Sequence, residues 1–288
     1  MTWFLDVRTE GVGGSVAPAA RLRRGVGIGP GAPKLETPVT APPAEFAPGR
    51  RVLLLVHGFN VSRPEAVVTY AKLEEALRLN ALPDDYLVIG VLWPGDFWVP
   101  VINYPAEAAD AKLSGRRVAD FIKTHFGRLG PVSFLSTSLG ARLVLEAVAQ
   151  MRPMKADRIC LTAAAVDDNC LARQYDAARA NAIQTTVLAS RKDKVLRLAY
   201  PVGDLVSDVF YDDDSPFRSA LGRAGPRPTV PALVSAAQIA DDQDYDHEDY
   251  FPPSSSSLNR RSGQTAAFAV SALTGQAHGW PFTKRIRR

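Results

Sequence analysis

Hydrophobic residues fall into short, uninterrupted runs along the chain from residue 51 onward. Five runs, bounded by turn-forming residues, cover residues 52–56, 86–92, 132–136, 158–166 and 185–190. Runs of this length, rich in Val and Leu, are typical of central strands in a parallel sheet, because helices cover both faces of such a sheet. A sixth strand is expected within residues 230–239.

Between these runs, apolar positions recur at the spacing of an amphipathic helix. The predicted helices cover residues 63–80, 106–127, 139–151, 171–180 and 265–273. Pro64 suits the first turn of the first helix, where a missing N–H removes no hydrogen bond. Strands that alternate with helices predict an α/β fold with a mostly parallel central sheet and helices on both faces.

Three segments depart from this alternation. Residues 1–50 are rich in Gly, Pro and Ala, which predicts a loose N-terminal extension with at most a short edge hairpin near residues 3–7. Residues 51–288 then form the main domain. Within it, residues 201–231 carry many Pro, Gly and Asp residues and are expected to form a lid over a pocket. Residues 252–263, with two prolines and four consecutive serines, are expected to form a mobile loop.

Composition places the chain among ordinary globular proteins. Hydrophobic residues make up 46% of the 288 residues and charged residues 22%. The formal net charge of +4 is too small to imply nucleic-acid binding. With no secretory leader and no run of about 18 apolar residues, we expect a cytoplasmic protein without a membrane span. Cys160 lies in a predicted buried strand and is expected to be a free thiol, and no Cys/His cluster suggests a metal site.

The most informative motif is Ser136-Thr137-Ser138-Leu139-Gly140, which follows a predicted strand and opens a predicted helix. A serine on such a sharp turn exposes its hydroxyl above the sheet, where it can act as a nucleophile. The turn brings two backbones together, so small residues are needed on both sides. Gly140 meets this need, while Ser136 stands where glycine is usual. Ser138 is therefore the candidate nucleophile, although a serine before a helix is also a common N-cap.

A second motif, His57-Gly58-Phe59-Asn60, ends the first buried strand. Acyl transfer places negative charge on a carbonyl oxygen, and two backbone N–H groups must point at that oxygen. One donor is expected from Leu139 and the other from Phe59 or Asn60, with Phe59 preferred. His57 itself is interpreted as a structural residue that fixes this loop.

Together, V-L-L-L-V-H-G-F-N and S-T-S-L-G-A-R resemble the α/β-hydrolase superfamily, and within it a bacterial branch known only as a domain of unknown function. The resemblance runs from about residue 51 to 250. It implies the chain order nucleophile, acid, base. Asp193, after the fifth strand, is the preferred acid, with Asp167 and Asp168 as alternatives. Asp193 is also a candidate N-cap for a short helix over residues 195–199.

The four histidines leave few choices for the base. His57 and His125 precede the acid in the chain, so the resemblance favours His247, in an acidic stretch soon after the last predicted strand, with His278 in reserve. These residues predict a serine hydrolase that acts on a small carboxylic ester through an acyl-enzyme, without cofactor or metal. The aromatic cluster in residues 97–104 is expected to line an acyl pocket or to build a cap. An acyltransferase on the same triad and a non-catalytic binding protein remain the alternatives.

Overall fold

The computed structural model describes residues 3–10, 14–27, 34–39, 42–96, 104–198, 219–255, 257–276 and 280, with the backbone alone for residues 104–108. The predicted aromatic cluster therefore lies outside the described residues, apart from the backbone of Tyr104. Most of the predicted lid, residues 201–218, and the reserve base His278 lie outside them as well.

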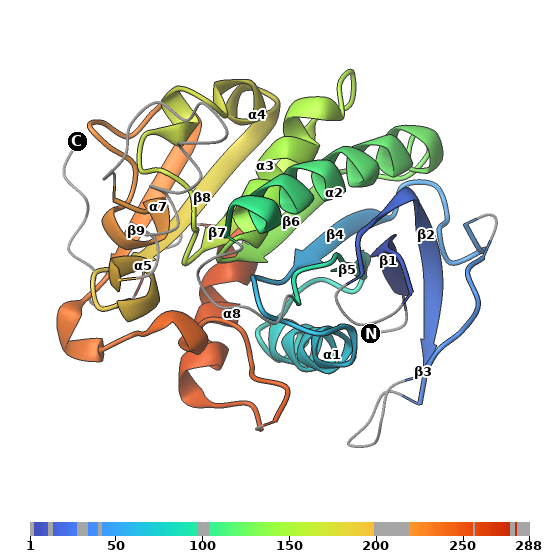
Figure 1. The fold of residues 1–288 in the computed structure, drawn as a ribbon, viewed down its shortest axis with the longest axis horizontal. Coiled ribbons are helices and arrows are strands. Elements are labelled where there is room, and N and C mark those ends of the chain that lie inside the picture. Colours follow the sequence, from blue (N-terminus) through green and yellow to red (C-terminus); the bar gives the residue numbers. More distant parts are fainter. Residues whose placement is uncertain are drawn as a thin grey trace.

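The described residues form one nine-stranded sheet in the order β3-β2-β1-β5-β4-β6-β7-β8-β9 (Figure 1). From β1 to β9 every neighbouring pair is parallel, whereas β1 with β2 and β2 with β3 are antiparallel. The strands are β1 (Trp3–Arg8), β2 (Val16–Val26), β3 (Lys34–Leu35), β4 (Arg51–Val56), β5 (Tyr86–Leu92), β6 (Val132–Thr137), β7 (Ala156–Thr162), β8 (Ala182–Ser190) and β9 (Val234–Ile239). The predicted mostly parallel sheet is confirmed.

Helices cover both faces of the sheet. The helices are α1 (Arg63–Leu79), α2 (Tyr104–His125), α3 (Gly140–Gln150), α4 (Asp176–Ala180), α5 (Lys194–Leu198), α7 (Leu221–Ala224) and α8 (Arg260–Thr274). Figure 1 shows α1 and α8 on one side of the sheet and α2 and α3 on the other. This arrangement gives the protein two hydrophobic cores, one on each face.

Strand β4 shows how the sequence builds these two cores. Val52, Leu54 and Val56 pack into the core under α2 and α3, while Leu53 and Leu55 pack into the core with α1 and α8. All five side chains are fully buried. Burying one such side chain contributes about 1.5–3 kcal/mol, so an apolar residue is favoured at every position of this strand.

Several predicted element boundaries are wrong. The predicted helix over residues 171–180 covers only Asp176–Ala180 as α4, and β8 begins at Ala182 rather than at residue 185. Strand β7 ends at Thr162 rather than at residue 166, because Ala163 has a φ of 43°, which is incompatible with an extended strand. Helix α8 begins at Arg260, five residues earlier than predicted, because the side chain of Asn259 accepts the Ser262 N–H and caps the helix. The predicted mobile loop over residues 252–263 is thus shorter than expected.

The prediction of a loose N-terminal extension is wrong for the described residues. All six residues of β1 are buried, and β1 pairs in parallel with β5 inside the sheet rather than at its edge. The expected short hairpin near residues 3–7 is present, since β1 pairs with β2, but β1 does not lie at the edge of the sheet. Asp6 and Arg8 interrupt the apolar pattern of β1 and hide its central position from sequence reasoning. Both charges are buried in ion pairs, Asp6 with Arg23 at 2.7 Å and Arg8 with Asp96 at 2.7 Å. A buried charge is tolerated when it is paired in this way.

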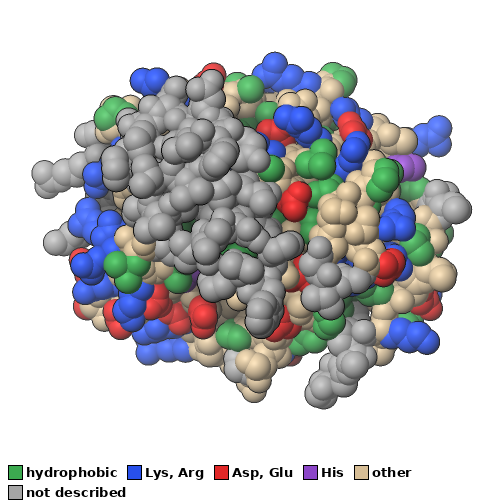
Figure 2. Space-filling view, viewed as in Figure 1, with side chains coloured by type: hydrophobic (Ala, Val, Ile, Leu, Met, Phe, Trp, Pro, Cys, Tyr) green, Lys and Arg blue, Asp and Glu red, His purple; other side chains and the backbone are tan. Residues whose placement is uncertain are grey.

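The surface charges and the two cysteines agree with what the composition suggests. In Figure 2, Lys and Arg side chains on the described surface are interspersed with Asp and Glu. Cys160 and Cys170 are both free and buried, as predicted for Cys160. Among the helices that the structure describes, none combines the length and the hydropathy that a bilayer crossing requires.

Candidate active site

The candidate residues all follow the carboxyl ends of parallel strands. The chain moves from β4 through α1 to β5 on one side, and then through α2 to β6 on the other side of β4. Such a reversal of strand order opens a crevice at the carboxyl ends of the strands, which is where ligands bind in open α/β sheets. Phe59 follows β4, Ser138 follows β6, Asp193 follows β8 and His247 follows β9.

Ser138 occupies a strained turn between β6 and α3. Its φ is 53°, in the left-handed region that residues other than glycine rarely adopt. Three backbone hydrogen bonds hold this conformation: the Ser138 N–H donates to Thr162, and the Ser138 carbonyl accepts from Ala141 and Ala165. Strain of this kind is maintained only when surrounding contacts fix it, and it directs the hydroxyl away from the sheet.

Close backbone approach explains the small residues around the turn. A β-carbon at Gly140 would lie 2.4 Å from the His57 carbonyl oxygen, and one at Gly58 would lie 2.7 Å from the Ser138 β-carbon. Both contacts are too close for any side chain. Ser136 is fully buried, and its hydroxyl has no hydrogen-bond partner among the described residues. The turn therefore accommodates serine where glycine is usual.

Ser138, His247 and Asp193 lie together in one hydrogen-bonded chain. The His247 Nε2 is 2.9 Å from the Ser138 Oγ, and the His247 Nδ1 is 2.8 Å from the Asp193 Oδ2. An ionised carboxylate can only accept, so Nδ1 carries the proton and Nε2 offers its lone pair to the serine hydroxyl. These three side chains have the contacts that activate a serine nucleophile.

Asp193 is fixed by the short helix that follows it. Its Oδ1 accepts the backbone N–H of Leu196 at 2.8 Å, and its carbonyl accepts the N–H of Arg197. The side chain is completely buried. One carboxylate therefore caps α5 with one oxygen and contacts His247 with the other, so the predicted capping role and the predicted contact with the base coexist.

For the alternative acids Asp167 and Asp168, and for the two histidines that precede Asp193 in the chain, the structure gives other positions or contacts. Asp167 forms a β-bridge with Ala220, and the Asp168 N–H donates to the Ser219 carbonyl. Of the acids proposed from the sequence, it is Asp193 that contacts the ring of His247. His125 ends α2, and His57 lies in the loop after β4.

His57 is buried at the centre of the loop after β4. Its N–H donates to the Tyr70 hydroxyl, and its carbonyl accepts from the indole of Trp93, on which its ring also stacks. Its Nδ1 is 2.8 Å from the Gly58 carbonyl oxygen. Burial lowers the pKa of His57 to about 4, so the ring is neutral at neutral pH. These contacts fit the structural role predicted for it.

This buried neutral histidine makes stability depend on pH. The pKa of His57 in the folded chain is about 4, below the ordinary value of 6.5. Between these two pH values, His57 binds a proton in the unfolded chain but not in the folded chain. We expect His57 to lower the free energy of unfolding by about 3 kcal/mol between pH 7 and pH 4. Urea denaturation at both pH values should show a smaller loss in His57→Gln than in wild type. Equal losses would contradict the assignment.

Some backbone N–H groups near Ser138 already donate a hydrogen bond, and others have no acceptor among the described residues. Asn60 and Val61 both donate their N–H groups to the Gly95 carbonyl, which anchors the loop after β4. Among the described residues, neither the Phe59 N–H nor the Leu139 N–H has an acceptor. Of the two loop donors considered from the sequence, Asn60 is thus engaged and Phe59 is available.

Several residues that build the site were missed by sequence reasoning. Tyr70 reads as an ordinary apolar position of α1, and Trp93 and Gly95 read only as the end of a strand. Their roles depend on contacts between segments far apart in the chain, which no local pattern reveals. Asp246 stood out only as one acidic residue in an acidic stretch.

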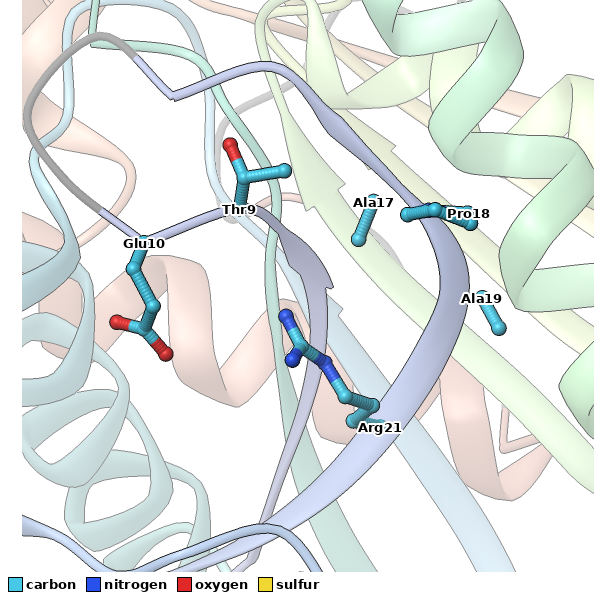
Figure 3. Close-up of a pocket in the computed structure, with 6 residues that line it drawn as sticks. All are labelled: Thr9, Glu10, Ala17, Pro18, Ala19 and Arg21. Atoms are coloured by element: carbon cyan, nitrogen blue, oxygen red, sulfur yellow. The ribbon is translucent and has the colours of Figure 1, made fainter.

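An open pocket of about 400 Å³ lies away from these residues, at the N-terminal hairpin (Figure 3). Its charged lining residues are already paired: Glu10 with Arg23 and Arg63, and Arg21 with the Arg8 carbonyl. Within the described ranges, no group of three or more His, Cys, Asp and Glu residues is arranged to hold a metal ion.

Comparison with known proteins identifies one family and several solved structures. A family model described as an alpha/beta hydrolase of unknown function (DUF900) matches residues 44–255. Esterase PE8 is 14% identical, with a TM-score of 0.43 over 82% of this chain and 97% of that chain. Esterase 2 of Thermogutta terrifontis, in a structure phosphoramylated by tabun, is 11% identical, with a TM-score of 0.41 over 93% of this chain and 94% of that chain. No curated protein matches the chain.

Proposed function

We propose that this chain, which belongs to the alpha/beta hydrolase family of unknown function DUF900, is a serine hydrolase that cleaves small carboxylic esters. Membership of the family confirms the superfamily and the fold class expected from the sequence. The observation that carries the proposed activity is the continuous chain of hydrogen bonds from Ser138 through His247 to Asp193.

In the proposed first step, Ser138 attacks the acyl carbon of the ester. The Oγ–C bond forms while His247 Nε2 takes the hydroxyl proton, and the carbonyl π electrons move onto oxygen. When the tetrahedral intermediate collapses, the bond to the leaving alkoxide breaks, and His247 returns the proton to it as an alcohol. Asp193 holds the ring in the required tautomer and stabilises the imidazolium that forms.

The negative oxygen of the intermediate requires donors that are otherwise unengaged. We assign this role to the backbone N–H groups of Phe59 and Leu139, because neither has an acceptor among the described residues. Each such donor contributes about 2.7–4 kcal/mol to transition-state stabilisation in hydrolases of this type. The bonds from Asn60 and Val61 to Gly95 hold the Phe59 loop in place before substrate arrives.

Water completes the cycle in a second half-reaction. His247 removes a proton from water, whose oxygen attacks the acyl carbon, and the Ser138 ester bond breaks with return of the proton to Oγ. The products are a carboxylic acid, an alcohol and the free enzyme. The chain's own residues supply every proton transfer in this scheme.

Covalent labelling tests this proposal. We expect a fluorophosphonate probe to modify the wild-type protein at one site, because these reagents react with activated serines and spare ordinary ones. Peptide mass spectrometry should place the adduct on Ser138, and hydrolysis of p-nitrophenyl acetate should fall in proportion to labelling. An adduct on another residue, or a folded protein that neither labels nor hydrolyses the ester, would favour a non-catalytic binding protein.

A further inference from the structure

We infer that Asp246 is a positioning residue that ties the loop carrying the acid Asp193 to the loop carrying the base His247. This inference rests on the proposed function, since it assigns Asp246 a part in presenting the same two side chains. Nothing in the general pattern of nucleophile, acid and base requires an acidic residue at this point.

The tie is made by one oxygen of Asp246. Its Oδ1 accepts the backbone N–H of Lys194 at 2.9 Å and the backbone N–H of His247 at 2.9 Å. Lys194 directly follows Asp193 in the chain, so this oxygen bridges the neighbours of both side chains. The second oxygen forms an ion pair with the Lys194 ammonium at 2.9 Å.

Asp246 is itself held from the other side. Its backbone N–H donates to the Asp249 Oδ2 at 2.7 Å, and the same oxygen accepts from Arg261 at 2.6 Å. Arg261, in the first turn of α8, also donates to the Gln243 carbonyl. The tie therefore runs from the end of β8, through the loop after β9, to the helix that covers one face of the sheet.

A second hydrogen bond also joins the end of β8 to the loop after β9. The buried Ser190 hydroxyl, at the end of β8, donates to the Tyr245 carbonyl at 2.7 Å. Tyr245 and His247 thus flank Asp246, and both are joined to the segment that begins at Ser190. Ser190 sets the separation of the two loops, whereas Asp246 fixes the backbone of His247 itself and hence the direction of its ring.

Substitutions of Asp246 can separate the effect of its hydrogen bonds from the effect of its ion pair with Lys194. An asparagine at this position keeps an Oδ1 that can accept both N–H groups but loses the ionic attraction to Lys194. That ion pair is solvent-exposed on the lysine side, and exposed pairs contribute little. An alanine leaves both N–H groups without the acceptor. The hydrogen bonds, rather than the charge, should therefore carry the effect.

The test compares Asp246→Ala and Asp246→Asn with Glu248→Ala, a matched control. Glu248 is exposed, lies on the other side of His247 and carries the same charge. We expect Asp246→Ala to lose about 10- to 100-fold in kcat for p-nitrophenyl acetate with KM nearly unchanged, because a misplaced base slows the chemical step. We expect Asp246→Asn and Glu248→Ala to stay within about threefold of wild type.

A readout without turnover keeps this inference separate from the proposed function. In proton NMR, the hydrogen-bonded His247 Nδ1–H gives a downfield resonance, assigned by its loss in His247→Gln. We expect this resonance to persist in Asp246→Asn and to broaden or vanish in Asp246→Ala. An unchanged resonance and kcat in Asp246→Ala, or equal losses in Asp246→Asn, would overturn the inference. A protein without esterase activity that still shows the predicted NMR difference would refute the proposed function alone.

Discussion

Ser138→Ala is expected to lower kcat for ester hydrolysis by about 10⁶-fold, the cost of removing the nucleophile from a serine triad. The substitution deletes the oxygen that we propose forms the acyl-enzyme but keeps a β-carbon on the strained turn. A small residual rate should remain, because the backbone donors can still stabilise an oxyanion formed by attack of water. Steady-state kinetics on p-nitrophenyl acetate would measure the loss, and fluorophosphonate labelling should vanish with it.

Folding of this variant provides the control. The backbone hydrogen bonds of Ser138 to Thr162, Ala141 and Ala165 do not involve its side chain, so the turn should persist. We expect a melting temperature close to that of wild type. Retention of more than a tenth of the wild-type activity in a well-folded Ser138→Ala protein would rule out Ser138 as the nucleophile.

Asp193→Asn is expected to lower kcat by about 10⁴-fold, the loss seen when a triad acid becomes an amide. Both oxygens of Asp193 accept hydrogen bonds, one from Leu196 and one from His247. Asparagine can replace only one of these acceptors. If its oxygen keeps the helix cap, its NH₂ faces Nδ1 and favours the tautomer with the proton on Nε2. In that tautomer, His247 cannot accept the proton of Ser138.

The same two-acceptor geometry supplies the control for this variant. Because the cap of α5 is retained, circular dichroism and thermal unfolding should change little. Asp193→Ala should lose the cap as well, which costs about 0.5–2 kcal/mol. Activity of Asp193→Asn within tenfold of wild type would show that another carboxylate orients His247.

Much of the fold and of the candidate site could be predicted from the sequence. Strands β4, β5 and β6 are buried on both faces, so their apolar runs are continuous and easily recognised. The choice of Ser138, Asp193 and His247 used chain order together with positions after strand ends. The structure places these three side chains in contact.

Features that depend on distant partners could not be predicted. The central position of strand β1 buries Asp6 and Arg8, and ion pairs of Asp6 with Arg23 and Arg63 and of Arg8 with Asp96 compensate that burial. Tyr70 lies at a helical core position, and its hydroxyl meets the His57 backbone only after α1 packs on the sheet. A local sequence pattern shows the polarity of a side chain but not which distant residue pairs with it in the fold.

The N-terminal hairpin, formed by β1 and β2, covers one edge of the sheet. The family model begins at residue 44, yet β1 occupies the hydrogen-bonding edge of β5, a strand buried along its whole length. Without β1, that edge would be an apolar template for adding a strand from another molecule. With β1 in place, β2 is the next strand outward in the sheet. Pro18 of β2 has no N–H and lies beyond the residues of β2 that pair with β3. The hairpin thus covers the apolar edge of β5 and places a strand interrupted by a proline outside it.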